Sequence, residues 1–182
     1  MVPLPSLSDS IVPVEAAFEA LSHAERINWM RGLGKKELAA LWKLTEGRPL
    51  AIEDLHGAEG EIVIHEGQNS LPAFNQFQKR VVKRGGVVQG YNHQSMAWLV
   101  GPGHFLVKSA DSPHPGAHFS YLEVATSVPD GFPPLQPNDK GLSTLVYAHM
   151  IDYLRRISPH ALIGAAYKNG KMTNDYFMLV RA

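Results

Sequence analysis

The spacing of hydrophobic residues along this chain changes near residue 48. Before that point, apolar side chains recur at three- and four-residue intervals, at Phe18, Leu21, Ile27, Met30, Leu38, Leu41 and Trp42. This spacing predicts short amphipathic helices. Ser22 followed by Glu25 is a capping-box pattern for a helix start, and Gly47 before Pro49 is a stop signal. We therefore predict a helical N-terminal cap over residues 1–48.

Beyond residue 48, short runs rich in β-branched and aromatic residues alternate with Gly, Pro and Asn. The runs span residues 61–67, 85–91, 95–100, 104–110, 118–128, 161–167 and 175–182. Such runs are typical of strands, and several in succession favour an antiparallel meander or barrel. We expect one domain over residues 1–182, of mainly β (α+β) class, in which the helical cap packs on an antiparallel β-barrel formed by residues 49–182.

Two turn sequences predict hairpins within this β region. Gly101-Pro102-Gly103 separates two apolar runs, so residues 95–100 and 104–109 are predicted to pair antiparallel. Asn169-Gly170 separates the last two runs and is a strong short-range hairpin signal.

The segment 71–86 has a mixed pattern. Phe74, Phe77 and Val81 fit one face of a helix, whereas the following residues suit a short strand, so we predict a helix that gives way to a strand near Lys79. Its four cations are interpreted as a solvated face that buries only alkyl stems, with an anion-attracting rim as the alternative. These cations are Lys79, Arg80, Lys83 and Arg84.

Residues 127–141 are rich in Pro and Gly and form a long connection for a compact domain. We interpret it as a simple surface loop, and because connections of this length are often lids over a site, a lid is the alternative.

The C-terminal part carries a family resemblance. It has a short Thr/Val/Tyr strand, the sequence Ile151-Asp152-Tyr153-x-Arg155, then Leu-Ile-Gly and a final aromatic strand. This order is similar to the GXWXG-type proteins of unknown function from bacteria and fungi, and Leu41-Trp42 with Gly47 and Pro49 matches their N-terminal half. The signature tryptophan has no counterpart, since the corresponding residues read "HGAEGEIVIHEG". The resemblance implies a calycin-like (lipocalin-like) β-barrel and no established reaction.

Composition narrows the classes of partner. Acidic and basic residues balance at 17 each, so the chain lacks the excess positive charge that nucleic-acid binding requires. It has no cysteine, which excludes disulfides and thiolate metal sites and suits a reducing compartment. The first residues have neither the basic nor the continuous apolar region of a secretory leader, and no apolar run reaches roughly 18 residues, so we expect neither a leader nor a membrane span. We expect a soluble cytoplasmic protein, and the sequence leaves its oligomeric state open.

The usual cofactor and catalytic motifs are missing. Nine histidines occur, but only His114 and His118 have a ligand-like spacing, and Pro115 and Gly116 between them argue against a helix that would align them. The sequence "GPGHFL" has Leu106 where a dinucleotide-binding motif needs its third glycine. Neither a nucleophile elbow nor a phosphate-binding loop occurs. We therefore predict no metal and no cofactor.

Polar residues within apolar runs are the candidate site. A carboxylate in such a run must be exposed, paired or shifted in pKa, and we expect Asp152 to pair with Arg155 or Arg156. The candidate acid–base groups are His93, His104 and Glu123, although a surface or satisfied core position is the preferred interpretation for each histidine. The candidate ligand-binding residues are Tyr91, Asn92, Trp98, Tyr121, Tyr147 and His149.

Three functions fit a small barrel with such a lining. The preferred one is binding of a small hydrophobic molecule by a carrier or sensor. The first alternative is a cyclase- or isomerase-type enzyme that positions a flexible apolar substrate and assists by proton transfer. The second is a haem-binding barrel with one axial histidine.

Overall fold

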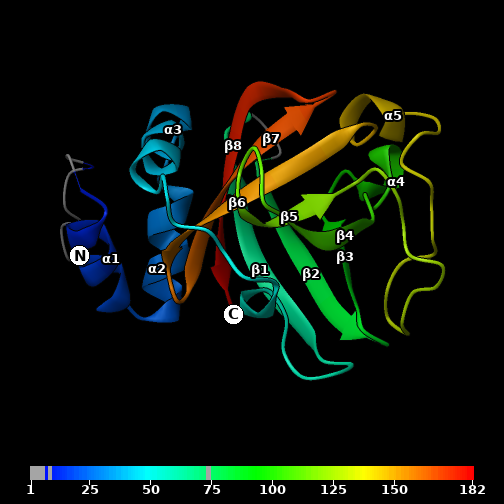
Figure 1. The fold of residues 1–182 in the computed structure, drawn as a ribbon, viewed down its shortest axis with the longest axis horizontal. Coiled ribbons are helices and arrows are strands. Elements are labelled where there is room, and N and C mark those ends of the chain that lie inside the picture. Colours follow the sequence, from blue (N-terminus) through cyan, green and yellow to red (C-terminus); the bar gives the residue numbers. More distant parts are fainter. Residues whose placement is uncertain (1–6, 8–9, 73–74) are drawn as a thin grey trace.

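The barrel is closed and antiparallel. The computed structural model describes residue 7 and residues 10–72 and 75–182. Within these residues, eight strands pair in sequence order and the last pairs with the first, which gives an up-and-down barrel (Figure 1). The strands are β1 (Ile62–Asn69), β2 (Gln76–Arg84), β3 (Val87–His93), β4 (Phe105–Ala110), β5 (Gly116–Ser120), β6 (Met150–Ser158), β7 (Ala161–Lys168) and β8 (Lys171–Arg181). The predicted antiparallel barrel is confirmed.

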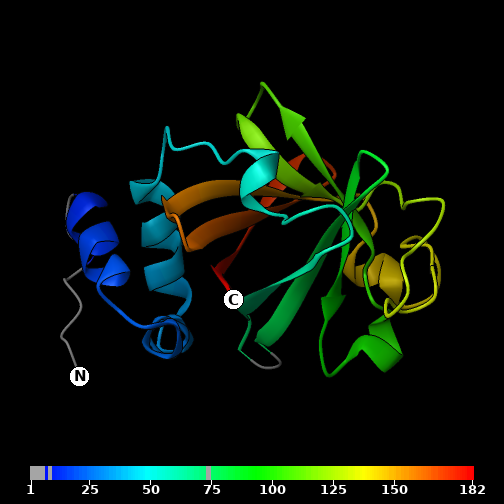
Figure 2. The same ribbon diagram turned by 90° about the horizontal axis from the view of Figure 1, so that it is seen from below.

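The N-terminal helices pack on the outside of the barrel, as predicted. Helices α1 (Val12–Glu19), α2 (His23–Arg31) and α3 (Lys35–Leu44) lie together on one side of it (Figures 1 and 2). The predicted capping box starts α2, since Ser22 Oγ accepts a hydrogen bond from the Glu25 amide. Their apolar faces form a first core with outward residues of β6, β7 and β8. This core includes Phe18, Leu38, Leu41, Ile163 and Met178.

The inside of the barrel is a second core. It is built from inward side chains that include Val81, Phe105, Phe119, Leu154 and Phe177. Inward glycines make room for the rings. A Cβ atom at Gly67 would lie 2.7 Å from Phe77, and one at Gly90 would lie 2.6 Å from Phe105. Protein side chains therefore fill most of the lumen.

The first predicted hairpin is wrong. Residues 97–100 form a short helix, α4 (Ala97–Val100), and β4 pairs with β3 through Gly90 and Phe105. The amide of Asn92 donates to the Pro102 carbonyl, which holds the chain across the end of the barrel and keeps residues 95–100 out of the sheet. The second hairpin is confirmed, because Asn169 and Gly170, with φ of 52° and 73°, join β7 to β8.

The prediction for segment 71–86 is right for the strand after Lys79 but wrong for the helix before it, where the structure describes it. Phe74 lies outside the described residues, but β2 is already a strand at Gln76. Arg84 is exposed as expected of a solvated face, whereas Lys79 is buried. Period-two alternation causes this difference, because it places Lys79 with its neighbours Phe77 and Val81 on the inner face of the barrel.

Loops and short helices close the ends of the barrel. The 3₁₀ helix η1 (Ile52–Asp54) precedes Leu55, whose buried side chain belongs to the inner core. At the end opposite the N-terminal helices, α4 lies beside α5 (Ser143–Val146), and the Ser143 hydroxyl donates to the Val100 carbonyl (Figure 1). The long 127–141 connection leads into α5.

His65 is a buried neutral histidine inside the barrel. Its Nε2 lies 2.9 Å from the Leu55 carbonyl and donates to it, while Nδ1 has no hydrogen-bond partner among the described residues. Burial lowers the pKa of His65 from 6.5 to about 4, although the Leu55 hydrogen bond acts in the opposite direction. The unfolded chain therefore binds a proton more readily than the folded one at pH values between these two.

We expect this histidine to make the protein sensitive to acid. The lowered pKa of His65 makes part of the free energy of unfolding depend on pH. This part, roughly 3 kcal/mol for a shift of this size, is fully present above pH 6.5 and is lost as the pH falls towards 4. His65→Gln keeps a donor for Leu55 but does not titrate, so urea unfolding at pH 7, 5 and 4 should show a smaller loss of stability. His104 and His118, whose pKa values burial also lowers, retain part of the effect. An equal loss of stability between pH 7 and pH 4 in the unaltered protein and in His65→Gln would show that His65 is not the source of the acid sensitivity.

Candidate functional site

An ion pair lies inside the barrel. Lys79 on β2 and Asp152 on β6 meet across the lumen, with 3.2 Å between Nζ and Oδ2, and their side chains are only 3% and 6% exposed. The predicted partners of Asp152 are wrong. Arg155 points outward and donates to the Trp42 carbonyl. Arg156 pairs with Asp54 of the 3₁₀ helix η1.

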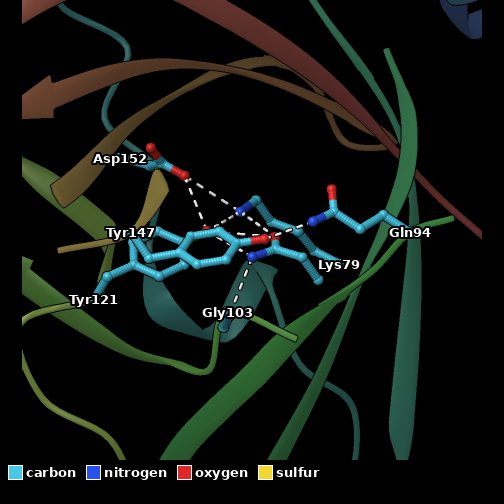
Figure 3. Close-up of polar contacts among 7 residues, drawn as sticks. Lys79, Gln94, Gly103, Tyr121, Tyr147 and Asp152 are labelled. Carbon is cyan, nitrogen blue, oxygen red and sulfur yellow. Dashed lines mark hydrogen bonds and ion pairs between the residues drawn. The ribbon is translucent and has the colours of Figure 1, made fainter. Parts of the chain in front are cut away.

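Lys79 is the centre of a buried hydrogen-bond network (Figure 3). Its Nζ also donates to Asn92 Oδ1 at 2.9 Å and contacts the Tyr121 hydroxyl at 2.5 Å. That hydroxyl lies 3.3 Å from Asp152 Oδ2, and Asn92 Nδ2 donates to the Gly103 carbonyl. Each ammonium proton of Lys79 thus has an acceptor, which a buried lysine requires. We call Lys79, Asn92, Tyr121 and Asp152 the lysine network.

Aromatic rings surround the lysine head group. Their centroids lie between 4.6 and 5.7 Å from Nζ, in the order Phe119, Phe105, Phe177, Tyr121 and Phe77. Ring faces attract a cation at such distances and otherwise present an apolar surface. The lysine network is therefore a polar cluster surrounded by aromatic rings.

Burial changes the proton affinities in this network. It lowers the pKa of Lys79 and raises the pKa of Asp152, because each charged form loses its hydration, while their mutual attraction acts in the opposite sense. The pKa of Tyr121 lies well above 10 because of burial and the nearby Asp152 carboxylate. Burial therefore brings the proton affinities of the Lys79 amine and the Asp152 carboxyl closer together. The arrangement can therefore move a proton between Lys79 and Asp152.

Tyr147 and Gln94 cover the network at the α4–α5 end. The Tyr147 ring stacks on Tyr121 with centroids 5.3 Å apart, and its hydroxyl accepts a hydrogen bond from Gln94 Nε2 at 2.6 Å (Figure 3). Gly103 is required beneath this cover, since it has a φ of 56° and a Cβ there would overlap the Tyr147 ring.

A pocket of about 280 Å³ adjoins the network at Tyr121. Glu123 and His149 contribute to its wall, and so does Asn138 from the end of the 127–141 connection. Asn138 is buried and donates to the carbonyls of Tyr121 and His104, which fixes the connection against the barrel. This pocket gives a small molecule a place beside the buried network.

The structure brings some of the predicted site residues together. Asn92, Tyr121 and Tyr147 meet in or over the lysine network, and Glu123 and His149 line the adjoining pocket with Tyr121. Glu123 also pairs with Lys108 on the outer surface. The function of each of these residues stays a prediction.

The remaining predicted residues do not reach the network. Tyr91 points outward and packs against Phe132 of the long connection, and His93 at the end of the same strand is exposed. His104 bonds to the Pro134 carbonyl, and Trp98 on α4 is 80% exposed. These side chains point away from the lumen or belong to residues outside the strands. The apolar residues around them in the sequence did not indicate this placement.

Sequence reasoning missed Lys79, although a signal for it was present. In a strand that starts at Gln76, Lys79 shares a face with Phe77 and Val81, both of which are apolar. A lysine between two inward apolar residues is a candidate buried charge.

Comparison of this chain with known proteins does not identify a family. No protein-family model, curated protein or solved structure matches this chain. The GXWXG resemblance stays a prediction. Among the described residues, no helix is long and apolar enough to cross a membrane. The same residues contain no cluster of three or more His, Cys, Asp or Glu side chains suited to a metal ion.

Proposed function

We propose that this protein binds a small, largely apolar molecule at the barrel end that holds the lysine network and its adjoining pocket. The observation that carries this proposal is the ion pair between Lys79 and Asp152, buried among aromatic rings. Replacing a buried ion pair with apolar side chains of similar volume is often neutral or stabilising. A barrel with a purely structural role gains little from such a pair, whereas binding and catalytic sites use one.

The surroundings suit a ligand with one polar group. The aromatic rings offer apolar contact, and the lysine network offers donors and acceptors that can orient a single polar atom. Entry to the network requires Tyr147 and Gln94 to move, because they close that end. Before Tyr147 and Gln94 move, we place the apolar body of the ligand in the pocket beside Tyr121.

The test is a search for the ligand followed by removal of the network. Native mass spectrometry should find a small apolar molecule in gently purified protein, or a screen of apolar alcohols and aldehydes should find one that raises the melting temperature. At a concentration of 100 times Kd, such a ligand stabilises the folded state by about 2.7 kcal/mol.

Matched double variants locate the ligand. Lys79→Met with Asp152→Leu removes the buried pair, and Lys35→Met with Asp175→Leu removes an ion pair of the same kind that is 54% and 41% exposed. We expect the buried double variant to lose the ligand-induced stabilisation and the exposed one to keep it. Equal stabilisation in both would place the ligand elsewhere.

An acid–base enzyme is the second candidate function. It is favoured by the carboxyl of Asp152 and the hydroxyl of Tyr121, which lie within hydrogen-bond distance of each other and of Lys79. A carrier returns its ligand unchanged, whereas a cyclase or isomerase converts it. In an enzyme, Asp152→Asn should lower turnover by about 10²- to 10⁴-fold.

A further inference from the structure

We propose that Lys79 binds an aldehyde ligand covalently as an imine inside the barrel. This inference rests on the proposed function, because the aldehyde must enter the same site. It is carried by the position of Nζ, which has a carboxyl oxygen at 3.2 Å, a phenol hydroxyl at 2.5 Å and the centroid of the Phe119 ring at 4.6 Å.

The first requirement of imine formation is an amine without its extra proton. Exposed lysines are protonated at neutral pH, and burial is the usual means by which a protein obtains a nucleophilic lysine. Lys79 is 3% exposed, and its desolvation lowers its pKa. Asp152 is positioned to take the proton, because its own desolvation raises the pKa of its carboxyl.

The second requirement is a group that removes the carbonyl oxygen as water. The Nζ lone pair adds to the carbonyl carbon and forms the C–N bond, while the π electrons move to oxygen. One of the two protons on nitrogen passes to that oxygen, which gives a neutral carbinolamine with a hydroxyl group. Asp152 then protonates the resulting hydroxyl, the C–O bond breaks and water leaves, and nitrogen loses its remaining proton to regenerate the acid. The products are an imine and water, so no oxidant or reductant is needed. The Tyr121 hydroxyl keeps its proton, so it can donate a hydrogen bond to the carbonyl oxygen during the addition.

The third consideration is the class of carbonyl compound. Rings of Phe119, Phe105 and Phe177 crowd Nζ within 5.1 Å, so a carbonyl carbon that carries only hydrogen on one side fits better than one with two carbon substituents. The same rings favour an apolar body. The site is therefore suited to an aliphatic or aromatic aldehyde.

The experiment traps the imine in the unaltered protein. Butanal and sodium cyanoborohydride are added at pH 6, where exposed lysines are almost fully protonated, and the hydride reduces any imine to a stable butylated lysine. Peptide mass mapping then gives the rate at each lysine. Lys35 is the internal control, because it pairs with Asp175 at 3.3 Å in solvent. We expect Lys79 to be butylated at least about tenfold faster than Lys35, since burial lowers the pKa of its amine and Asp152 lies beside it as a general acid. Butylation of Lys35 with none at Lys79 would overturn the proposal.

Two further measurements separate this inference from the proposed function. Butanol has the same chain but cannot form an imine, so its effect on the melting temperature reports binding alone. Stabilisation by butanol without trapping at Lys79 would refute the imine and leave the proposed function standing. In Asp152→Asn, which keeps the amine but removes the acid, trapping at Lys79 should slow by about tenfold or more. An unchanged rate in a folded Asp152→Asn protein would contradict the role given to Asp152.

Discussion

Asp152→Leu is expected to destabilise the protein by about 3–5 kcal/mol, because it leaves Lys79 buried without its counter-charge. Leucine has the same number and branching of side-chain heavy atoms as aspartate, so most of the loss comes from the unpaired ammonium and from the Tyr121 hydroxyl, which also loses an acceptor. Urea unfolding monitored by tryptophan fluorescence gives the free energy of unfolding.

Removing both partners should restore most of this stability. In Lys79→Met with Asp152→Leu, no buried charge remains and the side-chain volumes are nearly preserved, so we expect a stability close to that of the unaltered protein. The exposed pair provides the control, since Asp175→Leu should change stability by less than about 1 kcal/mol. If Asp152→Leu proves as mild as Asp175→Leu, the buried pair has little energetic weight and the main support for the proposed site is lost.

The parts of the fold that could be predicted are those that local sequence determines. Helix caps such as Ser22 with Glu25, and the Asn169-Gly170 turn, act within a few residues and were predicted correctly. The change from helical to period-two spacing near residue 48 is equally local. These signals suffice for helices packed on an antiparallel barrel.

The lysine network could not be predicted because its members meet only after the barrel closes. Lys79 and Asp152 lie on strands that face each other across the lumen, and nothing local links residues 73 positions apart. Asp152 was instead assigned to arginines nearby in sequence, which point elsewhere. For Lys79 the prediction was wrong about the face on which its side chain lies. A helix over its segment would place Lys79 at the surface, whereas the strand places it inside the barrel.

Gly164→Ala is expected to destabilise the protein by about 1–3 kcal/mol although it adds a single methyl group. Gly164 faces the lumen on β7, and a Cβ there would overlap the Phe177 ring on the neighbouring strand. That ring cannot simply withdraw, because it packs in the inner core and lies 5.1 Å from Lys79 Nζ. The same substitution should therefore weaken ligand binding.

Gly57 is the matched control for this effect. A Cβ at Gly57 would also overlap a neighbour, but that neighbour is the carboxylate of Glu61, which ends a long, exposed side chain that can change rotamer. We expect Gly57→Ala to change stability by no more than about 0.5 kcal/mol. Phe177→Leu should recover part of the stability lost in Gly164→Ala, because the smaller side chain vacates the space the methyl group needs. If Gly164→Ala unfolds at the same urea concentration as Gly57→Ala, the lumen has room to spare beside Phe177. A ligand could then enter the barrel without displacing the rings around Lys79.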